Sequence, residues 1–570
     1  GALRFVDDDR FQHVPMIDLG SGEPNEDGET PALTAPDLEA LAALPVLADE
    51  TALTQAQSAL EQAGLLPAAD GVIQATAGAA HTTFDAYDTE GAALVSAQLD
   101  TEVYYDLALD GVPLVGPGAK IELVFDGDGV ATFVLFALRG LERGESVAAI
   151  PPDQGAQLCR DAYGGEADDD AQIAAELVYF APPLESGGVT RIVPHYRCSG
   201  TATVDAQEMN LLRRFVPAIL ETPQVTLAVS ADGATVMGQT TVSGGVPPYS
   251  FAWSSHTTPL DETLASSAGE ISYALASREA VDVEVLSVVV TDADGLEATA
   301  SASVEISGET TILGAAPAVA GLARPATSPG RTDVGLEWTG FCNKYNLPGA
   351  GKSARHFARL MQRDGYAVQF NWGEKLAWER DFRDQSLGGT DHLWVDDVDY
   401  LLLQTHGQPL GFAFCVNKDT RPFYHSKARW GHIDLEWMGL DSCQVLKWSH
   451  PAGNLIVRWR DAFAGLHHLM GYDTDAYDSS NMGFLYAVLL TGNDPHGRGT
   501  FSRAYPVREA WALASKYGQP SEVVWVVVAP FGANNVTPLN DYFHGEGPVG
   551  PDLRGLGSGI RGFFVVRGRS

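Results

Sequence analysis

The feature that most constrains the fold is a series of apolar runs without polar alternation in the C-terminal part of the chain. The segments VDYLLL, residues 398–403, and VVWVVVAP, residues 523–530, are too short for helices and lack the alternation of a half-exposed strand. Runs of this kind are typical of strands that a parallel sheet buries on both faces. Helical patterns such as SARHFARLMQRDGY, residues 353–366, lie between them. We therefore predict an α/β sheet with helices on both faces.

The length of the chain predicts several domains, because one hydrophobic core rarely extends beyond about 250–300 residues and this chain has 570 residues. Residues 1–30 are acidic and are expected to form an irregular lead-in. Residues 31–221 combine helical patterns with Gly-containing hairpins, which predicts an α+β domain. Short strand-like runs in residues 222–307 predict an all-β sandwich. The small-residue segment 308–331 predicts a protease-accessible linker before an α/β domain over residues 332–570.

The formal charge of −38 disfavours nucleic acid and anionic membranes as partners, since binding to phosphates needs clustered Lys and Arg. No window holds the run of about 20 apolar residues that a membrane helix requires. The chain begins with Gly rather than Met, and we expect that a leader segment was removed. Together these features predict a secreted or cell-surface protein.

The cysteines allow two disulfide bonds. Cys159 and Cys198 lie in one predicted domain and can pair, and Cys342 and Cys415 can pair in another. This pairing leaves Cys443 as an odd thiol. The alternative at this point is that all of them are reduced and buried.

Two consecutive predicted strands end in side chains with acid–base or nucleophilic chemistry. His406 and Gly407 follow VDYLLLQT, and Cys443 follows EWMGLDS. Because the carboxyl ends of parallel strands meet at one edge of a sheet, neighbouring strands would place an imidazole beside a thiol. A protonated imidazole would lower the thiol pKa, and the backbone amides of Gly407 and Cys443 could bind an oxyanion. In the alternative interpretation, His406 caps a strand and Cys443 is a small buried residue, as in a degenerate pseudoenzyme.

The segments THG, residues 405–407, and DSC, residues 441–443, together with the strand order around them, resemble the caspase, legumain and gingipain group of cysteine peptidases. The resemblance implies a caspase-like fold and an endopeptidase, or a related acyl-transferring hydrolase, that acts on a peptide or protein. It implies Cys443 as nucleophile and His406 as proton carrier. By legumain-like analogy, Asn343 orients the histidine.

Three further resemblances concern other segments. VPLVGPGAKIELVFDGDG resembles propeptide modules that precede secreted metallopeptidases, which implies that residues 31–221 assist folding or inhibit the C-terminal domain intramolecularly. SGGVPPYSFAW and VVVTDADG resemble immunoglobulin-like and PKD-like modules of bacterial surface proteins, which usually act as spacers. GLEWTG and WGHIDLEWMGLDSC are similar to a bacterial domain family of unassigned function, which implies no activity.

Acidic and aromatic residues near the cysteine are weaker candidates. Asp441, Asp473, Asp475 and Trp448 are candidate substrate-binding residues. The set Asp473, Asp475 and Asp478 is a candidate Ca²⁺ site, and no other cofactor is expected. The alternatives are a solvated acidic loop and core packing of the tryptophan. The competing function class is a noncatalytic surface or adhesion protein that uses a caspase-like fold as a binding scaffold.

Overall fold

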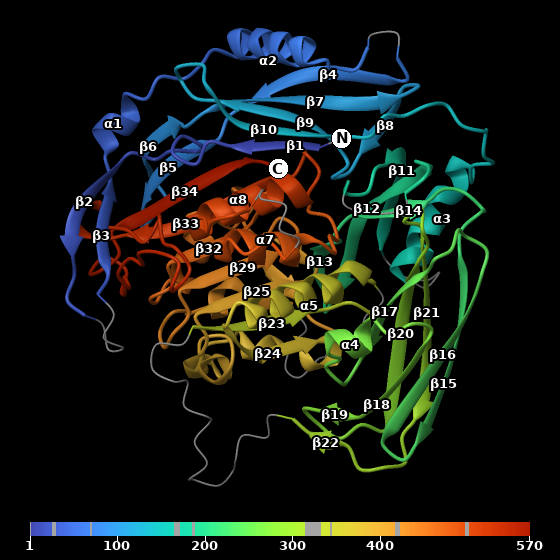
Figure 1. Ribbon diagram of the computed structural model, residues 1–570. Helices are drawn as coiled ribbons and strands as arrows, with labels where there is room; N and C mark the ends of the chain where they lie inside the picture. Colours follow the sequence, from blue (N-terminus) through green and yellow to red (C-terminus); the bar gives the residue numbers. More distant parts are fainter. Residues whose placement is uncertain are drawn as a thin grey trace.

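The computed structural model of the chain describes residues 2–24, 30–68, 71–164, 171–184, 189–313, 332–341, 345–415, 422–495 and 501–570. Within these ranges the secondary structure is mostly β, arranged in several sheets (Figure 1). The prediction of a chain with several structural units is confirmed at this level.

A 13-stranded sheet dominates the N-terminal part of the molecule and has the order β1-β10-β9-β7-β8-β11-β12-β13-β26-β27-β28, with β4 paired to β7 and β14 paired to β12. Its strands are β1 (Ala2–Val6), β4 (Ile73–Ala80), β7 (Thr101–Leu109), β8 (Val112–Val115), β9 (Ala119–Phe125), β10 (Ala131–Leu138), β11 (Gln172–Phe180), β12 (Pro194–Val204), β13 (Gln207–Asn210), β14 (Arg214–Pro217), β26 (Gly407–Gln408), β27 (Gly411–Ala413) and β28 (Pro422–Tyr424). The last three strands come from the C-terminal part of the chain. This sheet therefore joins segments that are about 200 residues apart, as in the pairing of Asn210 with Gly407.

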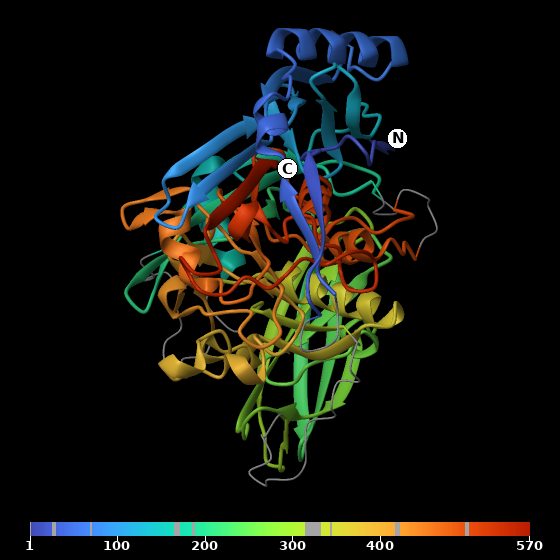
Figure 2. The same cartoon turned by 90° about the vertical axis from the view of Figure 1, so that its left-hand side faces the viewer.

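Two helices cover this sheet. The apolar stripe of α2 (Asp49–Ala63) packs on β4 and β7, and α2 ends at Gly64, whose φ of 65° suits a residue without a side chain. The second helix, α3 (Pro152–Tyr163), packs on β11 and β12. Figures 1 and 2 place α2 at one end of the molecule.

The expectation of an irregular lead-in over residues 1–30 is wrong for two segments. β1 pairs with β10, and β2 (Met16–Ser21) pairs with β3 (Ala32–Pro36), which precedes the short helix α1 (Leu38–Ala42). Each of these strands pairs with a strand that has a free edge. This pairing outweighs the preference of an acidic segment for irregular structure.

Residues 224–305 form two three-stranded sheets around one core. One sheet has the order β15-β16-β18 and the other β17-β20-β21. Their bounds are β15 (Gln224–Asp232), β16 (Thr235–Ser243), β18 (Glu270–Ala274), β17 (Ser250–Ser255), β20 (Val283–Thr291) and β21 (Glu297–Glu305). Trp253, Ile271 and Leu286 lie between the sheets and are buried. This sandwich also carries α4 (Glu262–Ala265) and β19 (Ala276–Ser277), which pairs with β22 (Thr311–Ile312).

A nine-stranded mixed sheet forms the centre of the C-terminal part, in the order β24-β23-β25-β29-β32-β33-β34-β5-β6. Its strands are β24 (Ala367–Gly373), β23 (Asp333–Trp338), β25 (Tyr400–Gln404), β29 (Trp437–Asp441), β32 (His468–Tyr472), β33 (Val524–Phe531), β34 (Gly562–Arg569), β5 (Thr83–Asp88) and β6 (Ala93–Gln98). The first five strands are parallel, and the pairs from β32–β33 onward are antiparallel. The N-terminal strands β5 and β6 complete this sheet.

The two faces of this sheet are covered differently. Helices α5 (Pro348–Arg363), α7 (Met482–Thr491) and α8 (Val507–Gly518) pack together on the face that Leu402 and Met470 present (Figure 1). The opposite face, which includes Leu401 and Leu403, is covered by short elements. These are α6 (Leu455–Trp459), the 3-10 helices η1 (Glu374–Leu376), η2 (Glu379–Asp381), η3 (Gln385–Leu387), η4 (Asp391–Leu393), η5 (His425–Lys427) and η6 (Arg460–Ala462), and the hairpin β30 (Ser449–His450) and β31 (Gly453–Asn454). A further 3-10 helix, η7 (Ala533–Asn535), follows β33 and contacts β3. The sequence predicts helices on both faces; the second face carries only short ones among the described residues, because no long amphipathic period occurs between β24 and β32.

Buried ion pairs hold the parts together. Lys516 Nζ on α8 lies 2.6 Å from Glu102 Oε2 on β7, and both side chains are buried. On the sandwich, Arg278 pairs with the buried carboxylate of Asp381, and its guanidinium lies 3.7 Å from the ring centroid of Trp378. Charges placed this deep require fixed partners, so these contacts fix how the parts are docked.

The predicted bond between Cys159 and Cys198 is present. Cys415 is also disulfide-bonded; its expected partner, Cys342, lies outside the described residues. Cys443 is the free cysteine of the described part of the chain. None of the described helices is long and apolar enough to cross a membrane.

Candidate functional site

The strands β25 and β29 are adjacent and parallel, with Gln404 opposite Asp441. The chain therefore leaves both strands at the same edge of the sheet, and it continues into His406 from one strand and Cys443 from the other. Gly407 lies directly against the second turn, because a Cβ atom added to it would stand 2.8 Å from the Cys443 carbonyl oxygen. We call this edge, formed by residues 405–407 and 441–443, the ledge.

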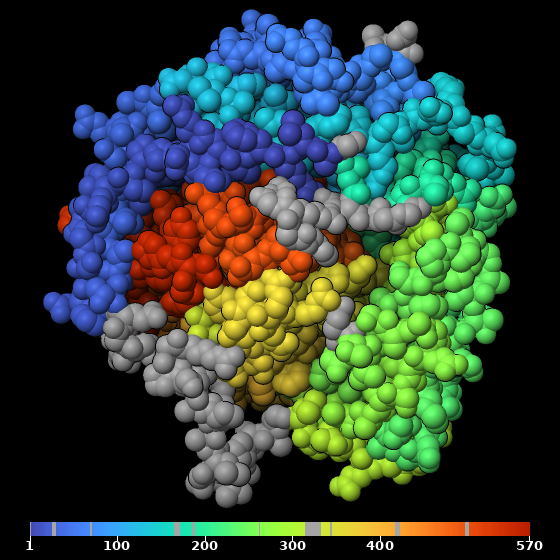
Figure 3. All heavy atoms as spheres, viewed as in Figure 1, coloured from blue at the N-terminus to red at the C-terminus, as the bar shows by residue number. Residues whose placement is uncertain are grey.

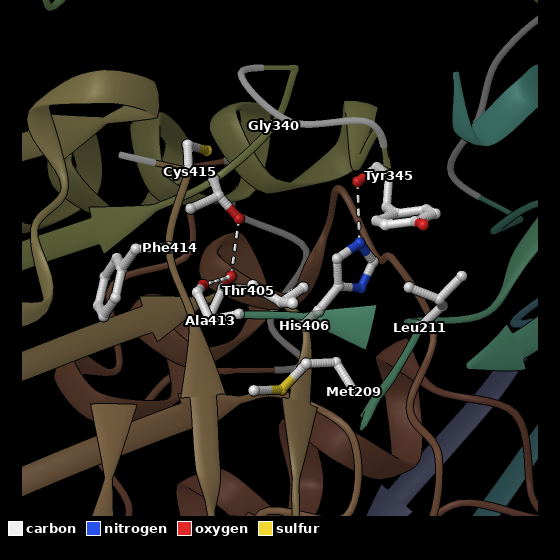
Figure 4. A pocket seen from close by; sticks show the side chains of 11 residues that line it. Met209, Leu211, Gly340, Tyr345, Thr405, His406, Ala413, Phe414 and Cys415 are labelled. Atoms are coloured by element: carbon white, nitrogen blue, oxygen red, sulfur yellow. Dashed lines mark hydrogen bonds between the residues drawn. The ribbon is translucent and has the colours of Figure 1, made fainter. Parts of the chain in front are cut away.

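His406 is buried on the ledge with both ring nitrogens engaged. Its Nδ1 accepts a hydrogen bond from the backbone N–H of Leu212 at 3.0 Å. Its Nε2 therefore carries the proton and donates to the carbonyl oxygen of Tyr345 at 2.8 Å (Figure 4). Burial lowers the pKa of His406 to about 4. The ring is consequently neutral at pH 7.

Cys443 is also fully buried. Its thiol donates to the carbonyl oxygen of Ala476 at 3.7 Å. Burial raises the thiol pKa well above its usual range, and the nearby carboxylate of Asp475 acts in the same direction. The thiol is therefore protonated at pH 7.

These contacts correct the expectation of a thiolate beside a protonated imidazole. The two residues reach the same ledge, but backbone groups occupy both nitrogens of His406 and the thiol of Cys443 bonds to a carbonyl. Burial favours the neutral form of each group. In the arrangement described here the pair is not ionised.

A segment from the N-terminal part of the chain, residues 207–214, lies across the ledge, and we call it the cover segment. Asn210 pairs with Gly407, which joins β13 to β26. The Arg213 N–H donates to the Ala476 carbonyl, and its carbonyl accepts from the Asp478 N–H, both at 2.9 Å. The cover segment is thus hydrogen-bonded to the His406 side of the ledge and to the loop after β32. The sequence did not predict this cover, because QEMNLLRR has no local pattern that points to a partner about 200 residues away.

A small cavity lies beside His406, between Thr405, Tyr345 and Met209 (Figure 4). Its volume is about 10 Å³, which suits one water molecule. Cys443 does not line it. The ledge therefore has no space for a substrate while the cover segment is in place.

The remaining predicted site residues have separate surroundings. Asn343 lies outside the described residues. Asp441 is fully buried, and its carboxylate oxygens have no hydrogen-bond partner in the described part of the chain. Burial raises its pKa well above the usual range, and the nearby carboxylate of Asp478 acts in the same direction. Trp448 packs against Tyr87 on β5, with the two rings tilted and their centroids 4.6 Å apart.

The three carboxylates proposed as Ca²⁺ ligands do not form one ligand set. Asp473 accepts from the Trp448 N–H at 2.8 Å, Asp475 accepts from Gln444 at 2.8 Å, and Asp478 accepts from the Gly349 N–H at 2.9 Å. Each acid satisfies a different local donor. The acidic run is therefore used to fix the loop after β32, which corrects the Ca²⁺ prediction.

A different group of side chains could hold a divalent cation. Asp399, Glu436 and His544 place ligand atoms within 4.8 Å of one another. Asp399 and Glu436 directly precede β25 and β29, so this group lies at the sheet edge opposite the ledge. Oxygen and imidazole ligands of this kind suit several divalent metals.

Comparison with known proteins gives one family match. Residues 336–568 match a family described as a domain of unknown function, DUF6345. The matched range includes both His406 and Cys443, whereas the cover segment lies outside it. No curated protein matches the chain.

Proposed function

We propose that the protein is a latent cysteine peptidase, or a related acyl-transferring hydrolase, whose nucleophile is Cys443. The observation that carries the proposal is the delivery of His406 and Cys443 to one sheet edge by neighbouring parallel strands. The resemblance of the THG and DSC segments to caspase-like peptidases supports it. The proposal includes a caspase-like C-terminal unit, an immunoglobulin-like sandwich and a secreted or cell-surface location.

The ledge provides the groups that acyl transfer needs. In the active arrangement, His406 takes the proton of the Cys443 thiol, and the thiolate attacks the carbonyl carbon of a peptide. Backbone N–H groups of Gly407 and Cys443 stabilise the oxyanion. The C–N bond then breaks as His406 protonates the leaving amine, and water hydrolyses the thioester with His406 as base.

Latency follows from the cover segment. Leu212 donates to the His406 nitrogen that would otherwise be free to accept a proton, and residues 210–213 fill the space that a substrate backbone requires. Displacing the cover segment would let water reach both side chains. The N-terminal part of the chain then acts as an intramolecular inhibitor, in line with its resemblance to a propeptide.

The test is to expel the cover segment by Leu212→Asp, because a carboxylate is strongly unfavourable at a position with 0% exposure. The matched control is Leu220→Asp, at a leucine that is 74% exposed. We expect iodoacetamide at pH 6 to modify Cys443 about tenfold faster in the first variant. Hydrolysis of a mixed peptide pool should appear with it, and Cys443→Ala should abolish that hydrolysis. Circular dichroism verifies that each variant is folded.

The second candidate is a noncatalytic binding protein, and the observation that favours it is the complete burial of Cys443 with a raised thiol pKa. Under this alternative, the Leu212→Asp variant still reacts slowly at pH 6. The rate would also be the same with and without His406→Ala. That result, in a folded protein with an exposed Cys443, would overturn the peptidase proposal.

A further inference from the structure

A groove with a volume of about 540 Å³ lies where the N-terminal sheet, the sandwich and the C-terminal unit meet. Phe180 and Phe215 line it from the first, Phe251 from the second, and Lys352 on α5 from the third. Figure 3 shows the sandwich lying alongside α5 on the face in view. The volume is in the range of ligand sites in proteins, about 300–1,000 Å³.

The groove differs from the rest of the molecule in charge. The whole chain has 74 acidic and 36 basic side chains. The groove is lined by four Lys or Arg residues, Arg213, Arg214, Lys352 and Arg355, and by two acids, Asp478 and Glu297. The balance of charge is therefore reversed, which favours an anionic ligand.

One of these basic groups retains its positive charge toward the groove. Lys352 is exposed and makes no ion pair with any other described residue. Arg214 donates to the carbonyl oxygens of Ala162 and Asn346, and its charge also favours the ionised form of Asp478, which lines the same groove. Arg213, by contrast, forms an ion pair with Asp475, so that carboxylate compensates its charge.

A row of aromatic rings forms an apolar part of the lining. The rings of Phe180 and Phe215 stack with centroids 4.3 Å apart, and Phe215 stacks on Tyr477 at 5.0 Å. The three residues come from β11, β14 and the loop after β32. This surface suits apolar or aromatic side chains of a ligand.

The sandwich contributes a free strand edge. β17 is the outer strand of its sheet, and residues 250–252 line the groove. His256 N–H bonds to Val285 across the pair, so by the alternation of an antiparallel ladder Phe251 directs its N–H and C=O away from β20. An extended peptide can add to such an edge as a further strand.

We propose that this groove binds an extended peptide segment that carries acidic side chains. A carboxylate of the peptide pairs with Lys352, its apolar side chains contact the aromatic row, and its backbone adds to β17. The proposal does not require Cys443 to be catalytic. The groove nevertheless approaches the ledge, because Tyr477 and Asp478 line it and the preceding residue, Ala476, accepts the Cys443 thiol.

The test uses full-length protein carrying Cys443→Ala, so that no hydrolysis can occur, and a fluorescein-labelled decapeptide of alternating Glu and Val. Fluorescence anisotropy should show binding about tenfold tighter than for the same peptide with Lys in place of Glu. Lys352→Glu should weaken binding about fivefold, whereas Lys352→Arg should not. The control Arg143→Glu, at an arginine with a side chain 69% exposed in the segment between β10 and α3, should leave binding unchanged.

Hydrogen exchange locates the peptide. We expect the amides of residues 250–252 to be protected when the acidic peptide is bound. Equal binding of the two peptides, no effect of Lys352→Glu, or an absence of protection at β17 would overturn the proposal. Full displacement of the peptide by millimolar inorganic phosphate would indicate a simple anion site and would overturn it as well.

Discussion

The backbone N–H of Leu212 donates a 3.0 Å hydrogen bond to Nδ1 of His406, across 194 residues of sequence. This bond fixes the tautomer of the ring, since the second nitrogen must then donate to Tyr345. It also joins the cover segment to the strand end where the candidate nucleophile lies. The position of residues 207–214 and the neutral state of His406 are therefore coupled.

The first prediction concerns acid stability. Because burial lowers the pKa of His406 to about 4, below the ordinary value of about 6.5, the unfolded state binds the extra proton between these values. The contribution of His406 to the free energy of unfolding is complete above pH 6.5. It falls by about 1.4 kcal/mol for each pH unit below that value. His406→Gln should therefore have a lower free energy of unfolding than the parent protein at pH 7.5. Urea unfolding should show that this difference is smaller at pH 5.

His467 gives the control of opposite sign. Burial opposes its charge, but the carboxylates of Asp541 and Asp552 outweigh burial and raise its pKa to about 10. Its contribution is complete below pH 6.5 and is lost as the pH rises. The free energy of unfolding that His467→Gln loses relative to the parent protein should therefore be larger at pH 5 than at pH 7.5. The same pH trend for both variants would contradict these assignments.

Local patterns predicted some of this structure. The run at residues 398–403 became a fully buried strand, β25, with β29 as its parallel neighbour. The disulfide bond between Cys159 and Cys198 was also one of the alternatives that the sequence allowed. Each depends on residue periodicity or on spacing within one segment.

What the sequence did not predict depends on contacts between distant segments. β5 and β6 extend the C-terminal sheet, whereas β26 to β28 extend the N-terminal one. Such exchanges leave no local signal, because each strand only needs a free edge. The burial of His406 and Cys443 was missed for the same reason, since residues 207–214 provide the cover.

The second prediction concerns the close approach at Gly407. A Cβ atom at this position would lie 2.8 Å from the Cys443 carbonyl oxygen and 2.9 Å from Ser442 Cβ. Because the backbone must move to relieve this contact, Gly407→Ala should reduce the free energy of unfolding by about 1–3 kcal/mol. The measurement is chemical denaturation monitored by tryptophan fluorescence.

Gly140→Ala is the matched control for that measurement. A Cβ atom added there meets no described atom within 4 Å, so the change should stay within about 0.5 kcal/mol. If both alanine variants were equally stable, the ledge would be more loosely packed than the contact with Cys443 indicates.

The third prediction concerns the docking of the sandwich. Arg278 has a side chain only 4% exposed, pairs with the fully buried Asp381, and lies over Trp378 and Trp394 at 3.7 and 4.8 Å. Arg278→Ala would leave a buried carboxylate without its cation, so unfolding should become easier by about 3–5 kcal/mol. Arg278→Lys should recover only part of this, because an ammonium group cannot pair through two nitrogens and stack at once.

The double variant Arg278→Met with Asp381→Leu separates charge from docking. Removing both charges should restore most of the lost stability, since no unpaired charge stays buried. In the single variant Arg278→Ala, hydrogen exchange should rise over residues 276–278 and 372–381 together, because these segments lose the same contact. Arg143→Ala, at the exposed arginine with a side chain 69% accessible, should change neither quantity. An Arg278→Ala variant with unchanged stability would show that the sandwich is held by its other contacts, such as the ion pair of Arg191 with Asp294.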